Sequence, residues 1–298
     1  LLFYLLITSS HPGLIIGGFY FFSFFLLYFI YSKRQKSDEN FSSILFRFGG
    51  FVLLLGLLLL GLLYSYTEVL AYITHSGKPD LGVHFNTTTI QSWLSFILPS
   101  ITNKNPTLFM NDISLRNCYL GILVLLFLKT GVLVDFKKQA FWYFTGIFFL
   151  ILSSNLPFVE SLRGLIPFIS YVRLSASFRI FGLISFVILA INLLQDYIHH
   201  PNKFLWGMNW IRRGWSIIIC MSICWSIYNI IAQDELGLLI SNANSLKSIF
   251  DHIGFYTFWM ISSITSLIFL YLILHFLHRK QWNYLLMICI LDMGQSVI

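Results

Sequence analysis

The chain has 298 residues, of which 57% are apolar and only 10% are charged, and its mean hydropathy is +0.78. A soluble globular domain carries about 25% charged residues, so this composition excludes a water-soluble protein. The net charge of +7 does not indicate a nucleic-acid partner, because the basic residues are scattered at the ends of apolar runs. We interpret these charges as signals of membrane topology.

Continuous apolar runs of about 20 residues predict transmembrane helices, since a helix of that length crosses the hydrocarbon core. The runs do not alternate apolar and polar residues, which favours helices over barrel strands. The sequence therefore predicts an all-α polytopic bundle of about nine spans, forming a single transmembrane domain over residues 1–298. The spans are expected near residues 1–10, 13–31, 43–65, 117–134, 140–157, 178–195, 213–231, 254–276 and 283–298.

The two ends of the chain predict a fragment of a longer protein. The run 1–10 is too short to cross a bilayer, and it lacks Met and the basic flank of a signal peptide. The first span is therefore expected to be incomplete. The run 283–298 also stops within apolar sequence.

Lys and Arg in the connections predict the orientation of the bundle. Twelve of the nineteen basic residues lie in one alternating set of connections, which is therefore expected to be cytoplasmic and includes residues 32–42 and 196–212. Two long connections, residues 66–116 and 158–177, are then extracytoplasmic. Their mixture of aromatic, apolar and polar residues predicts interfacial helices on the outer side.

Three charged residues of the outer side are candidates for substrate binding. Glu68 follows the third predicted span, where a solvated helix end and a ligand-binding carboxylate both remain open. Arg173 and Arg179 lie at the start of the span 178–195, against the positive-inside trend. A guanidinium fork suits phosphate, whereas snorkelling or an ion pair with Glu160 is the structural alternative.

Other polar residues are weaker candidates. Asp112 and Arg116 have the i,i+4 spacing of a surface ion pair. Asp292 lies in an apolar run, where a buried carboxylate indicates function, although it could also end a longer helix. The histidines and cysteines lack metal-ligand spacing, so no metal or other cofactor is predicted, and a divalent metal in the longer protein stays open. These residues include His75, His84, His275 and His278 and the four cysteines Cys118, Cys220, Cys224 and Cys289.

Short motifs follow one another in a characteristic order over residues 1–200. They are Ser10-His11-Pro12-Gly13, Tyr66-Thr67-Glu68-Val69-Leu70, Phe96-Ile97-Leu98-Pro99, Tyr119-Leu120-Gly121-Ile122, Leu156-Pro157, Ile166-Pro167-Phe168 and Phe178-Arg179-Ile180-Phe181. This order resembles the bacterial YfhO family of multi-pass membrane proteins, related to GT-C-type glycosyltransferases. Residues beyond 200 match only in hydropathy.

The resemblance implies a GT-C-like fold that transfers a sugar from a polyprenyl-phosphate carrier to a cell-envelope acceptor polymer. The reaction would take place on the outer face of the bacterial plasma membrane, with membrane lipid, carrier and acceptor as partners. Glu68, Arg173 and Arg179 would bind substrate. The two arginines lie six positions apart here, without the Pro of the Arg-x-Pro-x-Arg arrangement that relatives often have.

The resemblance leaves the catalytic residue unknown. GT-C enzymes usually place a catalytic Asp or Glu in the first outer loop, which would precede Leu1. The fragment is therefore expected to be inactive alone. A transporter or flippase, and a non-catalytic membrane scaffold, are the alternative functions.

Overall fold

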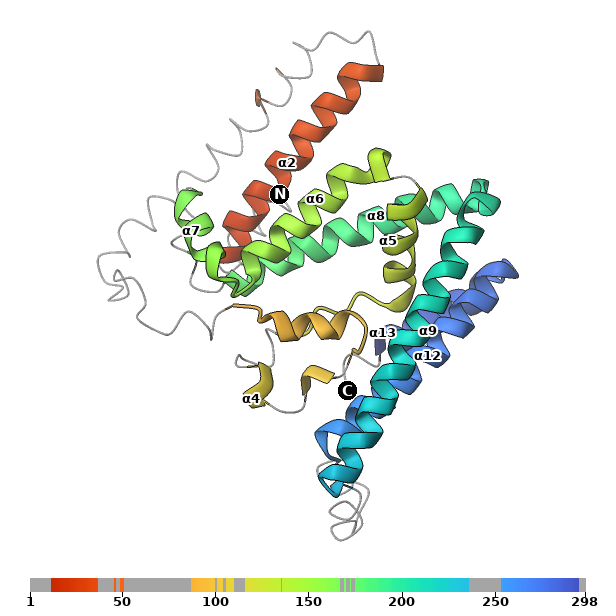
Figure 1. The fold of residues 1–298 in the computed structure, drawn as a ribbon. Coiled ribbons are helices and arrows are strands. Elements are labelled where there is room, and N and C mark those ends of the chain that lie inside the picture. Colours follow the sequence, from red (N-terminus) through yellow and green to blue (C-terminus); the bar gives the residue numbers. More distant parts are fainter. Residues whose placement is uncertain are drawn as a thin grey trace.

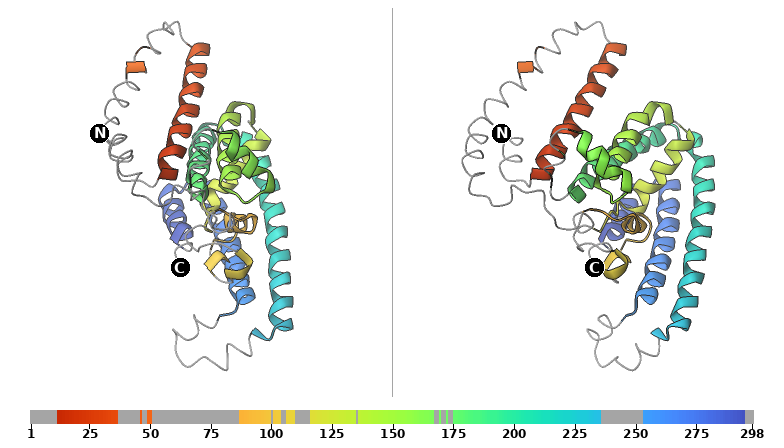
Figure 2. Two further views of the ribbon diagram at one scale, coloured as in Figure 1. Left: turned by 90° about the vertical axis from the view of Figure 1, so that its left-hand side faces the viewer. Right: turned by 60° about the vertical axis from the view of Figure 1, so that its left-hand side comes forward.

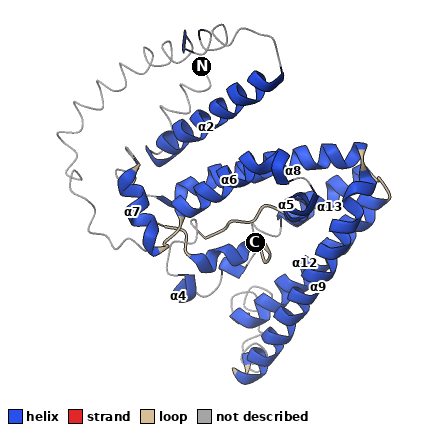
Figure 3. Cartoon of the chain, turned by 45° about the horizontal axis from the view of Figure 1, so that its top comes forward, coloured by secondary structure: helices blue, strands red, loops and turns tan. Residues whose placement is uncertain are grey.

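The computed structural model describes residues 12–36, 46, 49–50, 87–99, 101–103, 106–109, 116–134, 136–166, 169, 172, 175–235 and 253–294. In this part of the chain the regular elements are helices and none is a strand, which confirms the all-α prediction (Figure 3). By length and composition, three described helices could cross a membrane: Ser175–His199, Pro201–Ala232 and Phe255–His278. The predicted span 1–10, and nearly all of 43–65, lie outside the described residues.

One group of helices consists of α2 (Pro12–Lys36), α6 (Phe136–Ser153) and α8 (Arg179–His199), which pack against one another (Figure 1). Small residues bring α6 and α8 together, because a Cβ at Gly182 would lie 2.9 Å from the carbonyl oxygen of Gly146. Close backbone approach of this kind drives helix packing where lipid weakens the hydrophobic effect. The rings of Phe21, Phe149 and Phe181 join the three helices, with centroids 5.5–6.1 Å apart.

A second group contains α5 (Ile122–Val134), α9 (Pro201–Ala232), α12 (Phe255–His278) and α13 (Trp282–Gly294). Helices α9 and α12 lie side by side in both views of Figure 2 and run antiparallel. Polar side chains pair between them: Trp259 Nε1 donates to Ser222 Oγ at 2.6 Å, and Ser222 and Ser263 hydroxyls lie 3.2 Å apart. Helix α5 is only about 20 Å long, too short to cross a bilayer by itself.

Short helical elements from the two predicted outer connections pack against these groups. They are η1 (Ile90–Phe96), η2 (Ile101–Asn103), α4 (Pro106–Phe109) and α7 (Pro157–Leu165). The segment around η1 reaches both groups, since Thr88 N–H donates to the Ser153 carbonyl at 2.8 Å and Ser266 Oγ donates to the Ile97 carbonyl at 3.0 Å. It therefore links α6 to α12 (Figure 1).

Two helices begin away from the predicted limits of their spans. Helix α5 begins at Ile122 rather than at 117, because Gly121 has a φ of +87° and breaks the helical path. Helix α9 begins at Pro201 rather than at 213, so most of the predicted connection 196–212 is helical. Proline at the first helical position favours a start there, and the basic residues that follow do not interrupt a helix.

A carboxylate caps the beginning of α12. Glu235, which follows α9, is 8% exposed and accepts the backbone N–H groups of Tyr256 and Thr257 at 3.1 and 2.8 Å. The Thr257 hydroxyl also donates to it, at 2.8 Å. The first N–H groups of a helix have no intrahelical partner, so Glu235 satisfies two of them. It also ties the end of α9 to the start of α12.

We expect Gly254→Ala to destabilise the protein, because a Cβ at this position would lie 2.2 Å from Glu235 Cδ and displace the carboxylate. The expected loss is about 1–3 kcal/mol, the usual cost of leaving buried polar groups unsatisfied. Unfolding in detergent micelles, followed by tryptophan fluorescence, measures it. Gly214→Ala in α9 is the matched control, since a Cβ there meets nothing within 4 Å. Equal losses in the two variants would contradict the capping role.

Candidate functional site

Arg179 is the one predicted substrate-binding residue that the structure describes, because Glu68 and Arg173 lie outside the described residues. The 3-10 turn η5 (Ser175–Phe178) runs directly into α8, so the continuous helix starts at Ser175 and Arg179 lies in its second turn. Its side chain is half-buried and lies near Cys118, a buried residue that precedes α5. The start of α8 thus lies near the segment that precedes α5.

A set of buried polar residues, here called the polar layer, lies next to this position. Hydrogen bonds connect it: Cys118 N–H donates to Ser95 Oγ at 2.8 Å, and Ser95 Oγ donates to the Ser92 carbonyl at 2.6 Å. The hydroxyls of Ser92 and Thr89 lie 2.8 Å apart. The polar layer comprises Thr88, Thr89, Ser92, Ser95, Arg116, Cys118, Ser153 and Ser154. It brings η1, the end of α6 and the approach to α5 together.

Arg116 is a structural member of the polar layer. It is 6% exposed, its Nη1 donates to the Thr102 carbonyl at 3.4 Å, and its guanidinium carbon lies 5.7 Å from the ring centroid of Phe109. The predicted surface ion pair with Asp112 is therefore wrong in placing Arg116 at the surface; Asp112 itself lies outside the described residues. The guanidinium instead holds η2 and α4 together.

Arg163 of α7 caps the carboxyl end of α6. Its Nε and Nη2 donate to the Leu152 carbonyl at 3.0 and 2.7 Å, and Nη2 also donates to the Ser154 carbonyl at 2.7 Å. Burial lowers the pKa of Arg163 to about 10, and the Glu160 carboxylate opposes this shift. Glu160, considered above as a partner of Arg173 or Arg179, thus acts on Arg163, three positions further along α7. That spacing was visible in the sequence.

Asp292 caps the beginning of α5. It is 1% exposed, and its carboxylate accepts hydrogen bonds from the Tyr119 hydroxyl and, at 2.8 Å, from the backbone N–H of Ile122. A negative charge is stabilising at the amino end of a helix. The sequence predicted a function for Asp292, and the structure shows that it stabilises a helix end. Its partners, Tyr119 and Ile122, lie about 170 positions earlier in the chain, so the sequence pattern did not connect them with Asp292.

The ends of α5 and α13 meet part-way along α12. Helix α13 turns back after His278 and runs along α12, so Asp292 lies about 15 Å along it from Trp282. The non-helical backbone that leads into α5 is buried at Cys118, Tyr119 and Leu120. Within a membrane such backbone is tolerated only where protein covers it.

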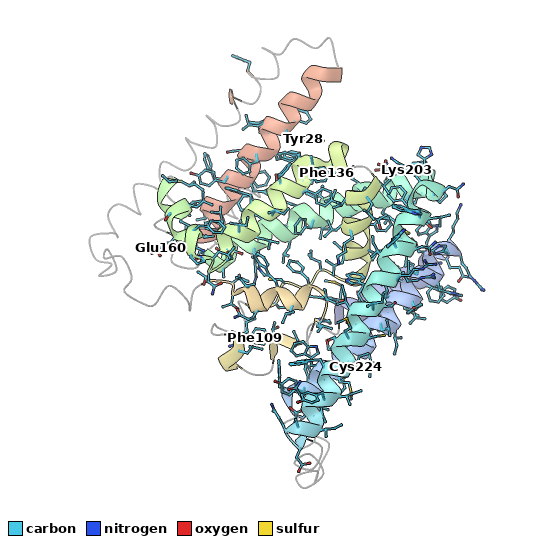
Figure 4. The ribbon with its side chains drawn as sticks, viewed as in Figure 1. Tyr28, Phe109, Phe136, Glu160, Lys203 and Cys224 are labelled. Carbon is cyan, nitrogen blue, oxygen red and sulfur yellow. The ribbon has the colours of Figure 1, made fainter. Side chains whose placement is uncertain are left out.

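The described residues form a surface hollow away from Arg179, and they form no cluster of metal-binding side chains. A shallow, mostly apolar hollow of about 760 Å³ runs along α9 from Ser216 to Tyr228. Cys224 is one of its lining residues. Figure 4 shows Cys224 on the side of the molecule opposite Glu160, which follows the end of α6. No charged side chain lines the hollow, so it offers nothing to a phosphate. Within the described ranges, no three His, Cys, Asp or Glu side chains gather as a metal site.

We expect Arg163→Ala to lower the free energy of unfolding by about 2–4 kcal/mol, because the α6 carbonyls lose charged donors. Arg163→Lys should recover only part of this, since an ammonium cannot donate as a planar fork. Thermal unfolding in micelles measures both. Glu160→Gln is the control, because Glu160 is exposed and its pairing is worth little. A loss in Arg163→Ala no larger than in Glu160→Gln would rule out the cap.

No protein-family model matches this chain, and comparisons with curated proteins and with solved structures give no match either.

Proposed function

We propose that the protein is a multi-pass, GT-C-like enzyme of the bacterial plasma membrane. It transfers a sugar from a polyprenyl-phosphate carrier to a cell-envelope acceptor polymer on the outer face. Among the described helices, three are long and apolar enough to cross a membrane, which supports the membrane placement. The observation that carries the proposal is Arg179, a half-buried guanidinium near the beginning of one of these helices.

The surroundings of Arg179 suit an amphiphile with a phosphate at one end. A guanidinium binds phosphate oxygens through two parallel hydrogen bonds, and the amino end of a helix favours an anion. An exposed apolar stripe runs along α8 from Ile180, the residue after Arg179, through Ile184 and Ile191; these side chains are 40%, 40% and 58% exposed. A polyprenyl chain can lie along this stripe while its phosphate meets Arg179.

In sugar transfer the carrier phosphate is the leaving group, so negative charge builds up on it as the bond to the sugar breaks. A fixed guanidinium stabilises that charge more in the transition state than in the bound substrate. Arg179 would fill this role, and Glu68 and Arg173 remain the further substrate-binding residues that the resemblance implies. The general base is not assigned.

We expect Arg179→Ala to weaken binding of a polyprenyl phosphate to the purified protein by about tenfold or more, as loss of a charged hydrogen-bond donor predicts. Binding of the matching polyprenyl alcohol should change little, because the alcohol lacks the charge. Arg179→Lys should retain part of the preference for phosphate. Quenching of tryptophan fluorescence by each ligand measures the affinity of the protein for the phosphate and for the alcohol. An unchanged phosphate-to-alcohol ratio in a correctly inserted Arg179→Ala variant would exclude the phosphate role.

A transporter or flippase is the second candidate, favoured by the junction of α5 and α13. Two short helices meet there at a buried carboxylate, and non-helical backbone leads into one of them. Interrupted helices with ionisable groups part-way through the membrane are typical of transport sites. Asp292 would then gain and lose a proton as the substrate crosses.

We expect Asp292→Asn to separate the two functions. An amide can accept from Ile122 N–H and donate to the Tyr119 oxygen. The free energy of unfolding should therefore fall by only about 1 kcal/mol, because the variant loses just the attraction between a negative charge and the amino end of α5. In vesicles, a transferase then keeps its sugar transfer, whereas a proton-coupled flippase loses its movement of fluorescent polyprenyl phosphate between leaflets. Asp292→Ala, which removes both hydrogen bonds, is the destabilised control. Protein-dependent lipid movement that Asp292→Asn abolishes would replace the transferase with the flippase.

A further inference from the structure

One end of the second helix group carries exposed basic and tryptophan side chains, here called the basic end. Its tryptophan side chains are exposed: Trp206 by 63%, Trp210 by 61% and Trp282 by 39%. The basic end comprises Lys203, Arg213, Arg279, Lys280, Trp206, Trp210 and Trp282, all of them exposed. Exposed indoles beside cations suit a partner that is both apolar and anionic.

The antiparallel register of α9 and α12 brings these residues to one end. The hydroxyls of Ser216 and Tyr271 lie 3.2 Å apart, as do those of Ser222 and Ser263. Moving toward the start of α9 therefore corresponds to moving toward the end of α12. The α8–α9 turn and the α12–α13 turn consequently lie at the same end, where Figure 4 labels Lys203.

The charge at this end is strongly positive. Residues 196–213 and 275–285 contain five Lys or Arg residues and a single acid, Asp196. Each Lys or Arg near an anionic leaflet contributes to attraction, and such clusters next to membrane helices bind acidic lipids. The basic end thus complements a negatively charged membrane surface.

A second aromatic group fixes how the helix pair lies relative to a membrane. Trp225 and Tyr228, near the other end of α9, are 55% and 67% exposed and their rings lie 6.3 Å apart. Between Trp210, which lies one turn before Arg213, and Tyr228 the helix rises about 27 Å, close to the thickness of a bilayer core of about 30 Å. Exposed Trp and Tyr concentrate at both membrane interfaces, so the two aromatic groups bracket the hydrocarbon and place the basic end at one interface.

We propose that the basic end binds the headgroups of anionic phospholipids, with the indoles of Trp206, Trp210 and Trp282 seated at the interface beside the cations. The two exposed aromatic groups are separated by about the thickness of a bilayer core. A soluble acidic partner would not account for this separation, so we favour lipid. The inference rests on the membrane placement within the proposed function and is independent of sugar transfer and of Arg179.

Spin-labelled lipids in proteoliposomes test this inference. The probes are spin-labelled phosphatidylglycerol and phosphatidylcholine, and the readout is their relative association constant at the protein. Wild-type protein should select the anionic probe. The variant K203Q/R213Q/R279Q/K280Q should bring the two probes within about twofold of each other. The charge-preserving variant K203R/R213K/R279K/K280R is the matched control and should keep the wild-type preference.

Three results would overturn the inference: no anionic preference in wild type, a preference unchanged by the four Gln substitutions, or an equal loss in the charge-preserving control. Alkaline extraction of the same vesicles reports membrane insertion separately. Protein stripped by alkali would refute the membrane placement, and with it both proposals. Protein that stays inserted but shows no lipid preference would refute the lipid surface alone.

Discussion

A backbone N–H or C=O at the end of a helix needs a partner, and where the surrounding protein or lipid covers a helix end, water cannot provide it. In this chain charged side chains meet that need. Asp292 bonds to the start of α5, Glu235 to the start of α12 and Arg163 to the end of α6. Each sign suits its position, since the amino end of a helix is partly positive and the carboxyl end partly negative. A chain with only 10% charged residues thus uses Asp292, Glu235 and Arg163, within its described part, at helix ends.

These caps change how the remaining charges are interpreted. A buried carboxylate inside a membrane protein suggests chemistry, yet Asp292 and Glu235 each satisfy a helix. Arg179 differs in position, because it lies inside the first turns of a long apolar helix beside the polar layer. An exposed isoleucine stripe begins at the next residue, Ile180, and runs along α8. Because a cation and the amino end of a helix both favour an anion, Arg179 is the charge on which the functional hypothesis rests.

Sequence alone predicted the helices whose apolar runs are long, since bilayer thickness sets their length. The predicted span 254–276 agrees closely with α12, and the placement of Arg179 near the beginning of a helix also agrees with the structure. The helix ends were less predictable. The late start of α5 depends on the positive φ of Gly121, and the burial of Arg116 depends on Phe109 of another element. Such features arise from contacts between distant segments, which periodicity does not encode. Glu68 and Arg173 remain predictions.

The contact between Asp292 and Ile122 joins residues 170 positions apart. A ribosome making the chain delivers α5 long before it delivers α13, so the first amide of α5 stays without this carboxylate until synthesis has passed residue 292. Glu235 and Thr257, by contrast, are 22 positions apart, and α9 and α12 can join as soon as both have emerged. The α9–α12 pair can therefore enter the membrane as a unit, while the junction at α5 cannot close until α13 has also been made.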